Sequence, residues 1–150
     1  MEYREPKEKN NLFYLCSLVE CISRKTKNEK CDIFNALGEK NIKNIYEYAD
    51  TYHCEDINNI AEDFIEKCNI QSGNYDCITG ITFEVPSVYD MGKVYKRFIW
   101  ETAMNEKLEV LQAVKQIYTS RKICRKLEDY NSSLFYDNEK NIYLFYKETA

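Results

Sequence analysis

Glycine, proline and histidine are scarce in this sequence. Its 150 residues include four glycines, two prolines and one histidine. Loop-rich all-β folds place glycine and proline in many turns, so this scarcity argues against them. Neither of the common phosphate-binding loops, G-x-x-x-x-G-K-[ST] and G-x-G-x-x-G, occurs in the chain. Nucleotide binding through loops of those two kinds is therefore excluded.

Long apolar runs are absent as well. No run approaches the roughly 18 to 20 apolar residues that a membrane-spanning helix needs. The start of the chain, residues 1–9, also lacks the apolar centre of a secretory signal. We therefore expect a cytoplasmic protein with no membrane segment.

Cysteine is plentiful, but its pattern predicts neither disulfides nor a metal site. The seven cysteines are an odd number, and no C-x-x-C pair occurs. Four of them lie on apolar faces of expected helices, where a thiol acts as a small core side chain: Cys16, Cys21, Cys68 and Cys124. His53, the sole imidazole, is expected on the surface. We expect no metal, no cofactor and no catalytic Cys–His pair.

The residues that are abundant predict an all-α fold. Apolar residues make up 44% of the chain and charged residues 31%, enough for a buried core with a mixed-charge surface. Apolar spacing of three and four predicts a bundle of about six to seven helices. Their expected ranges are 12–24, 28–37, 42–49, 57–68, 88–103 and a long helix over 105–127 capped by Asn105, with a tail over 138–147 that favours helix over a hairpin with 134–136.

Turn-forming residues over 69–76 separate the chain into two halves. The sequence therefore predicts a single helical domain over 1–150, or two lobes, 12–68 and 77–150, joined by this connection. Residues 81–85 alternate and are β-branched, so one short extended segment is possible there. It could lie across the helices or pair with a strand of a partner.

The segment after Pro86 has the pattern of a helix start. Ser87 and Asp90 stand three apart, as in a capping box. Gly92 then falls in the second turn, where it costs about 1 kcal/mol relative to alanine. This cost indicates a close approach, either by another helix of the same chain, which is favoured, or by a ligand or partner. The side chains that would surround it are Tyr89, Asp90, Lys93, Tyr95 and Arg97.

Charge is separated along the chain, although the formal net charge is only −4. Residues 44–76 hold eight acids and one lysine, whereas residues 93–126 hold nine basic residues and three acids. The basic cluster, which consists of Arg121, Lys122, Arg125 and Lys126, could complement the negative end of its own helix. It could equally contact an acidic protein surface or nucleic acid, with Tyr118 and Tyr130 available for stacking.

A family resemblance rests on the stretch Val85-Pro-Ser-Val-Tyr-Asp-Met-Gly-Lys-Val-Tyr-Lys-Arg-Phe-Ile99. It resembles a motif that recurs in small uncharacterised proteins of low-GC gut bacteria and their mobile elements. The first half of the chain is similar to short all-helical domains of unknown function that are encoded beside toxin-like ADP-ribosyltransferase domains. The resemblance implies an accessory or antitoxin-like role, and it supplies no catalytic residue.

Three hypotheses of function follow from these patterns. The first is a non-catalytic protein-interaction protein with a protein partner, and the second is a nucleic-acid binder that uses the basic helix over 115–126. The third is an enzyme with an uncommon site near 89–97, where the side chains could bind phosphate or act as acid and base. The candidate contact residues are Tyr89, Asp90, Gly92, Lys93, Tyr95, Arg97, Arg121, Lys122, Arg125 and Lys126.

Overall fold

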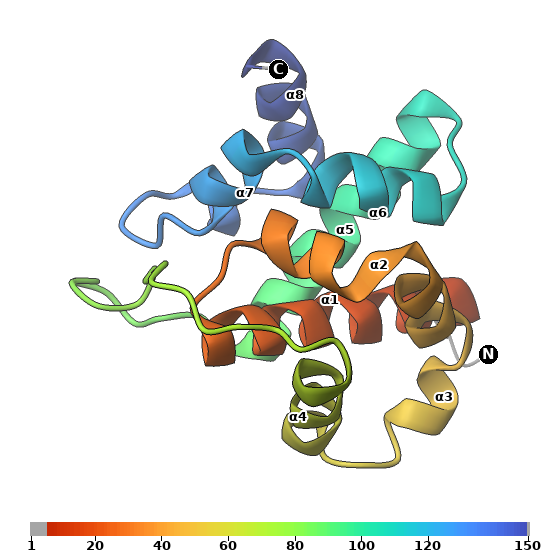
Figure 1. Ribbon diagram of the computed structural model, residues 1–150. Helices are drawn as coiled ribbons and strands as arrows, with labels where there is room; N and C mark the ends of the chain where they lie inside the picture. Colours follow the sequence, from red (N-terminus) through yellow and green to blue (C-terminus); the bar gives the residue numbers. More distant parts are fainter. Residues whose placement is uncertain (1–5, 150) are drawn as a thin grey trace.

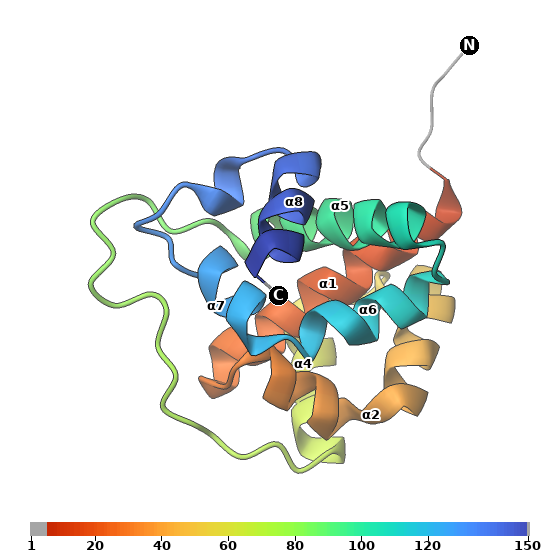
Figure 2. The same ribbon diagram turned by 90° about the horizontal axis from the view of Figure 1, so that it is seen from above.

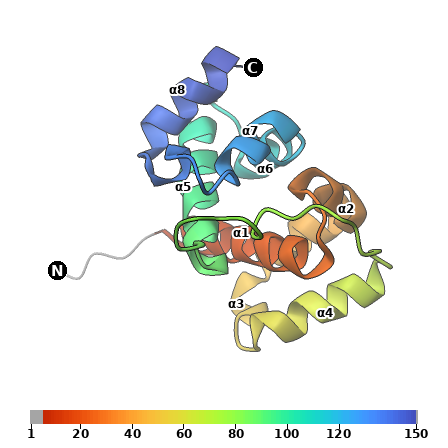
Figure 3. The same ribbon diagram turned by 90° about the vertical axis from the view of Figure 1, so that its left-hand side faces the viewer.

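Helix α1 (Lys7–Thr26) is the central element of the computed structural model, which describes residues 6–149. It packs against α2 (Lys30–Glu47), α4 (Ile57–Lys67) and α5 (Val88–Glu106). Helices α3 (Ala49–Tyr52) and α4 lie on one side of it, as Figures 1 and 3 show. Because it is enclosed in this way, α1 buries residues on all sides, including the polar Ser17 and Glu20.

The C-terminal helices lie on the other side of α1, where they pack mainly against α5 and α2 (Figure 3). These are α6 (Val110–Tyr118), α7 (Arg121–Leu127) and α8 (Glu139–Thr149), with a 3-10 turn, η1 (Leu134–Tyr136), before α8. Between α4 and α5, residues 68–87 form a strap that runs round the outside of the helices (Figure 2). No strand occurs within residues 6–149, so the all-α prediction is confirmed.

The break between the two helices expected over 28–37 and 42–49 is confirmed at Gly38. The element α2 covers both helices, and Gly38 within it has a non-helical backbone, with a φ of 79° and a ψ of 157°. The tail is helical, as favoured from the sequence, and residues 81–85 belong to the strap instead of a strand.

The predicted long helix over 105–127 is wrong. Helix α5 continues to Glu106, so Asn105 lies inside it, and its side-chain amide donates to the Glu101 carbonyl at 2.7 Å. The chain breaks again between α6 and α7, where the Thr119 hydroxyl donates to the Lys115 carbonyl at 2.6 Å. Apolar side chains keep a helical spacing through both α6 and α7, which is why the spacing alone predicted one helix.

The expected start of α5 is confirmed. The Asp90 amide donates to Ser87 Oγ and the Ser87 amide donates to Asp90 Oδ2, both at 3.0 Å. This reciprocal pair satisfies two backbone donors at the helix start, which is worth about 1 kcal/mol. The capping box therefore fixes the direction in which α5 leaves the strap.

Buried side chains from both halves of the chain form one contiguous core. Three of the cysteines expected in the core are buried there, namely Cys16, Cys21 and Cys124, while Cys68 packs at its edge. Within residues 6–149, no helix combines the length and the apolar character needed to cross a membrane. Residues 1–5, part of the start used in the expectation about secretion, lie outside the described residues.

Candidate functional site

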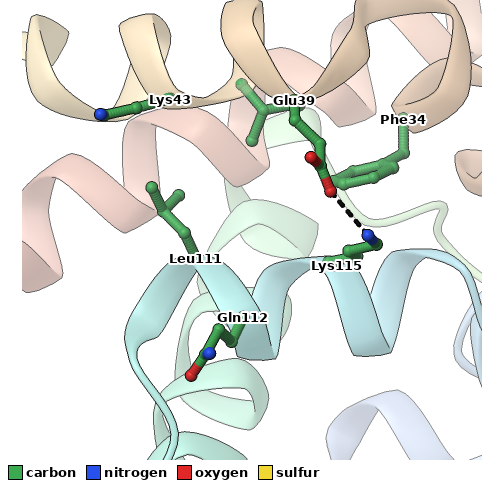
Figure 4. A pocket seen from close by; sticks show the side chains of 7 residues that line it. Phe34, Glu39, Lys43, Leu111, Gln112 and Lys115 are labelled. Carbon is green, nitrogen blue, oxygen red and sulfur yellow. Dashed lines mark ion pairs between the residues drawn. The ribbon is translucent and has the colours of Figure 1, made fainter.

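A groove between α2 and α6 is the clearest candidate binding surface. It encloses about 330 Å³ and is seen from close by in Figure 4. Helix α2 contributes one wall and α6 the other. The lining side chains are Phe34, Glu39, Ile42, Lys43, Leu111, Gln112 and Lys115.

The floor of this α2–α6 groove is apolar and its rim is charged. Phe34 and Ile42 are almost fully buried, and Leu111 is half-buried beside them. Lys115 Nζ lies 2.7 Å from Glu39 Oε1 across the groove, the ion pair drawn in Figure 4. Because both side chains are mostly exposed, this pair contributes at most about 1 kcal/mol and can open easily.

Gly38 shapes the α2 wall of the groove. Its φ of 79° lies in the region that favours glycine, and a Cβ there would meet no atom within 4 Å. Conformation, rather than lack of space, therefore accounts for glycine at this position. Since Phe34 and Ile42 lie on either side of this break, their placement in one groove depends on it.

The basic cluster is largely paired within the chain. Arg121 binds Asp32 at 2.6 Å and Glu29 at 2.9 Å, and Arg125 also pairs with Glu29. Hydrogen bonds from these arginines lower the pKa of Glu29 and of Asp32. The pairs join α7 to the start of α2, which is a structural task that the sequence did not reveal.

The two lysines of the basic cluster are less engaged. Lys122 Nζ donates to the Thr149 carbonyl at 2.6 Å, and Lys126 has no ion pair or side-chain hydrogen bond in the described part of the chain. All four basic residues and Asp129 line a shallow hollow of about 510 Å³. The structure therefore brings the cluster together, with much of its charge balanced by Glu29 and Asp32.

The candidate residues over 89–97 divide between the core and the surface. Tyr95 has no exposed surface and stacks on Tyr118 at 5.3 Å between ring centroids. Burial holds its pKa well above the ordinary value, so its hydroxyl stays protonated. Gly92 is buried against Ser17 of α1, which is the approach by a helix of the same chain favoured from the sequence. Neither residue can contact a partner in this conformation.

The remaining four candidates of this segment reach the surface. Tyr89 is 52% exposed and lies beside Phe13, with 6.1 Å between the ring centroids. Asp90 forms the capping box, while Lys93 and Arg97 point from α5 into a small hollow next to α8. Of the six candidates of this segment, Asp90, Lys93 and Arg97 therefore line one hollow, Tyr89 is exposed outside it, and Gly92 and Tyr95 are buried.

A buried charge network is the largest feature that the sequence did not predict. Lys30 Nζ is buried between Glu20, at 3.1 Å, and Glu128. Arg24 completes the charge balance by binding Glu20 at 2.8 Å, and the Tyr75 hydroxyl donates to Glu128 at 2.7 Å. Four elements meet here: α1, α2, the end of α7 and the strap.

The charges of the network balance, because its two cations pair with two carboxylates. Burial lowers the pKa of Lys30, but the neighbouring charges of Glu20 and Glu128 outweigh burial and hold this pKa well above its ordinary value. Lys30 therefore stays charged with its partners, as buried ion pairs require. A signal for the network exists in the sequence, since Glu20 falls within the buried face of α1, but nothing there identifies its partners.

The core thiol Cys16 and the possible metal ligands are the groups that a reactive site could use. Burial raises the pKa of the Cys16 thiol to about 12, so it does not supply a thiolate near neutral pH. His53 is exposed. Among residues 6–149, no group of three or more His, Cys, Asp or Glu side chains is placed to hold a metal ion.

Comparisons with protein-family models, with curated proteins and with solved structures find no match for this chain.

Proposed function

We propose that this chain is a non-catalytic protein-interaction protein with an accessory, antitoxin-like role, and that its partner binds in the α2–α6 groove. The observation that carries the proposal is the apolar floor of the groove, open to the surface between two helices. Grooves of this kind accept an apolar side chain from a partner helix or segment. Phe34, Ile42 and Leu111 are the residues that such a side chain would contact.

The lysines at and near the groove favour a partner that has acidic residues at its binding surface. Lys43 and Lys115 stand at the rim of the groove with Glu39, whose exposed pair with Lys115 a partner's carboxylate could replace. Lys122 and Lys126 are exposed on α7, which follows α6 in the chain. Acidic residues around the inserted apolar side chain would pair with these lysines. Such charges act mainly on the rate of association and on partner choice.

A nucleic-acid partner is the second candidate, because four basic residues line the hollow on α7. Glu29 and Asp32 weigh against it, since they already pair with the two arginines and would repel a phosphate. Binding to nucleic acid would show a steep loss of affinity as the salt concentration rises. Failure to bind any DNA or RNA at low salt would remove this candidate.

The test is affinity purification of the tagged chain from its host, with two matched leucine variants. Leu111→Asp places a charge on the groove floor, whereas Leu144→Asp changes an exposed leucine on α8. We expect the partner to be retained by wild type and Leu144→Asp and lost, by about tenfold or more in affinity, with Leu111→Asp. Equal retention by both variants would refute binding in the groove.

Reversal of the charge of Lys126 tests the acidic character of the partner independently. Lys126→Glu is suitable because this lysine makes no ion pair within residues 6–149, whereas reversal of Arg121 or Arg125 would break the pairs with α2. We expect slower association of the partner with Lys126→Glu and unchanged folding by circular dichroism. An unchanged association rate would place the acidic part of the partner elsewhere.

A further inference from the structure

A second hollow lies between α5 and the start of α8, away from the residues that line the α2–α6 groove. This α5–α8 hollow encloses about 220 Å³. Its floor is apolar, with Val94 half-buried and Phe135 and Ile142 buried. Residues 90, 93, 94 and 97 follow the three-and-four spacing of one helix face, so a single face of α5 forms one wall.

Two cations, Lys93 and Arg97, stand on that wall. Lys93 and Arg97 are exposed, and neither has an ion pair or a side-chain hydrogen bond within the described residues. Asp90 lies beside them but its carboxylate accepts the Ser87 amide in the capping box. Arg121 differs from these two cations, because it is already paired with Glu29 and Asp32. Lys93 and Arg97 are therefore available to an anionic group such as a phosphate.

The opposite wall offers an aromatic surface and acceptors. Tyr136 is 74% exposed at the rim, and its ring rests on Phe135 with 4.1 Å between centroids. Asp137 accepts hydrogen bonds from Asn138 and Asn141, and Glu139 has no ion pair in residues 6–149. Because these carboxylates face the cations, a purely anionic ligand fits poorly. A ligand that is anionic at one end and carries N–H donors at the other fits both walls.

An adjoining hollow extends the available space. It encloses about 180 Å³ and shares Arg97 and Glu139 with the α5–α8 hollow, while Trp100 contributes a second aromatic side chain. Together the two hollows reach the size of sites for small organic ligands, which is roughly 300 to 1,000 Å³. Arg97 and Glu139 lie at the boundary between them, where each can reach a ligand in either space.

We infer that the α5–α8 hollow binds a nucleoside monophosphate whose base carries an amino group. The phosphate pairs with Lys93 and Arg97, the base stacks on the ring of Tyr136, and the amino group donates to Glu139. Base stacking on an aromatic side chain is worth about 1 to 3 kcal/mol in nucleic-acid binding proteins. Side-chain cations thus take the place of the glycine-rich phosphate loops that the sequence lacks. The inference is independent of the partner proposed for the α2–α6 groove.

Isothermal titration of the full chain with AMP at low salt tests this site. We expect AMP to bind, and Lys93→Ala/Arg97→Ala to weaken it by about tenfold to a hundredfold. The control is Lys40→Ala/Lys140→Ala, which removes the same charge at two exposed lysines outside both hollows. We expect the control to bind within about twofold of wild type, and circular dichroism is used to check that both variants fold.

Comparison of AMP with IMP and with inorganic phosphate tests the contacts of the amino group and of the nucleoside separately. IMP, which has a carbonyl in place of the amino group, should bind more weakly than AMP, and inorganic phosphate more weakly still. No AMP binding at millimolar concentration, or equal losses in both double variants, would overturn the site. Equal affinity for AMP and inorganic phosphate would overturn the assignment of a nucleoside ligand.

Discussion

Gly92 lies where α5 crosses α1, and its missing side chain allows the two helices to approach closely. A Cβ at this position would lie 2.1 Å from Ser17 Oγ and 3.0 Å from Ser17 Cα. We expect Gly92→Ala to lower the free energy of unfolding by about 1 to 3 kcal/mol, because overpacking outweighs the better helix propensity of alanine. Urea denaturation measures this loss.

A double-mutant cycle identifies the cause. Ser17 Oγ is buried and has no hydrogen-bond partner in the described residues, so Ser17→Ala removes the nearest clashing atom at little cost. Gly92→Ala should therefore cost less in the Ser17→Ala background, by about 0.5 kcal/mol or more. Additive effects of the two substitutions would mean that contacts other than Ser17 set the packing at this crossing.

At the scale of elements, ion pairs hold α7 against the start of α2, and they make stability depend on pH. Hydrogen bonds from Arg125 and Arg121 lower the pKa of Glu29 and Asp32 in the folded chain. A lowered folded pKa stabilises the protein above the unfolded pKa, and this stabilisation is lost as pH falls. We expect Glu29→Gln to lower the Tm at pH 7 and to reduce its fall between about pH 5 and 3.

The matched control for this prediction is Glu66→Gln, at an exposed acid of α4 that has no ion pair among residues 6–149. It should leave both the Tm and its pH dependence close to wild type. If Glu29→Gln instead kept the wild-type pH dependence, other carboxylates would govern the acid transition. Thermal melts followed by circular dichroism across this pH range decide between the two results.

The helices themselves were largely predictable, because each buries one apolar face. Apolar spacing located α1, α4 and α5, and the Ser87–Asp90 pair located the start of α5. The break at Thr119 was not predictable in this way, since apolar residues keep a helical spacing through both α6 and α7. Periodicity therefore reports which face is buried and not where the backbone turns.

At the scale of the whole molecule, the sites depend on contacts that no local pattern contains. Phe34 and Leu111 share the floor of one groove although they are far apart in the sequence, and Lys30 meets Glu20 and Glu128 in the core. The predicted interface residues Lys93 and Arg97 do reach a hollow, but its other wall comes from 135–142. The sequence therefore indicated one wall of the α5–α8 hollow, whereas the groove and the charge network depend on residues that only the fold brings together.

The strap is attached to the rest of the molecule at the buried charge network, and a single hydroxyl tests that attachment. Tyr75 donates to Glu128 at 2.7 Å, while backbone bonds from Gly73 and Tyr75 to the end of α1 run beside it. Tyr75→Phe removes the hydroxyl alone and leaves Lys30 paired with Glu128. Since a hydrogen bond to a charged group is worth about 1.5 to 3 kcal/mol, we expect the strap to open locally more often.

Hydrogen exchange measured by mass spectrometry detects this opening. Amides of peptides that cover 71–77 should exchange faster in Tyr75→Phe, whereas those of α1 should change much less, because the network still holds α1, α2 and α7 together. Tyr48→Phe, at an exposed tyrosine, is the control and should exchange like wild type throughout. Equal acceleration in α1 and in the strap would mean that the Tyr75 hydroxyl supports the whole fold, and that the strap does not open as a separate unit.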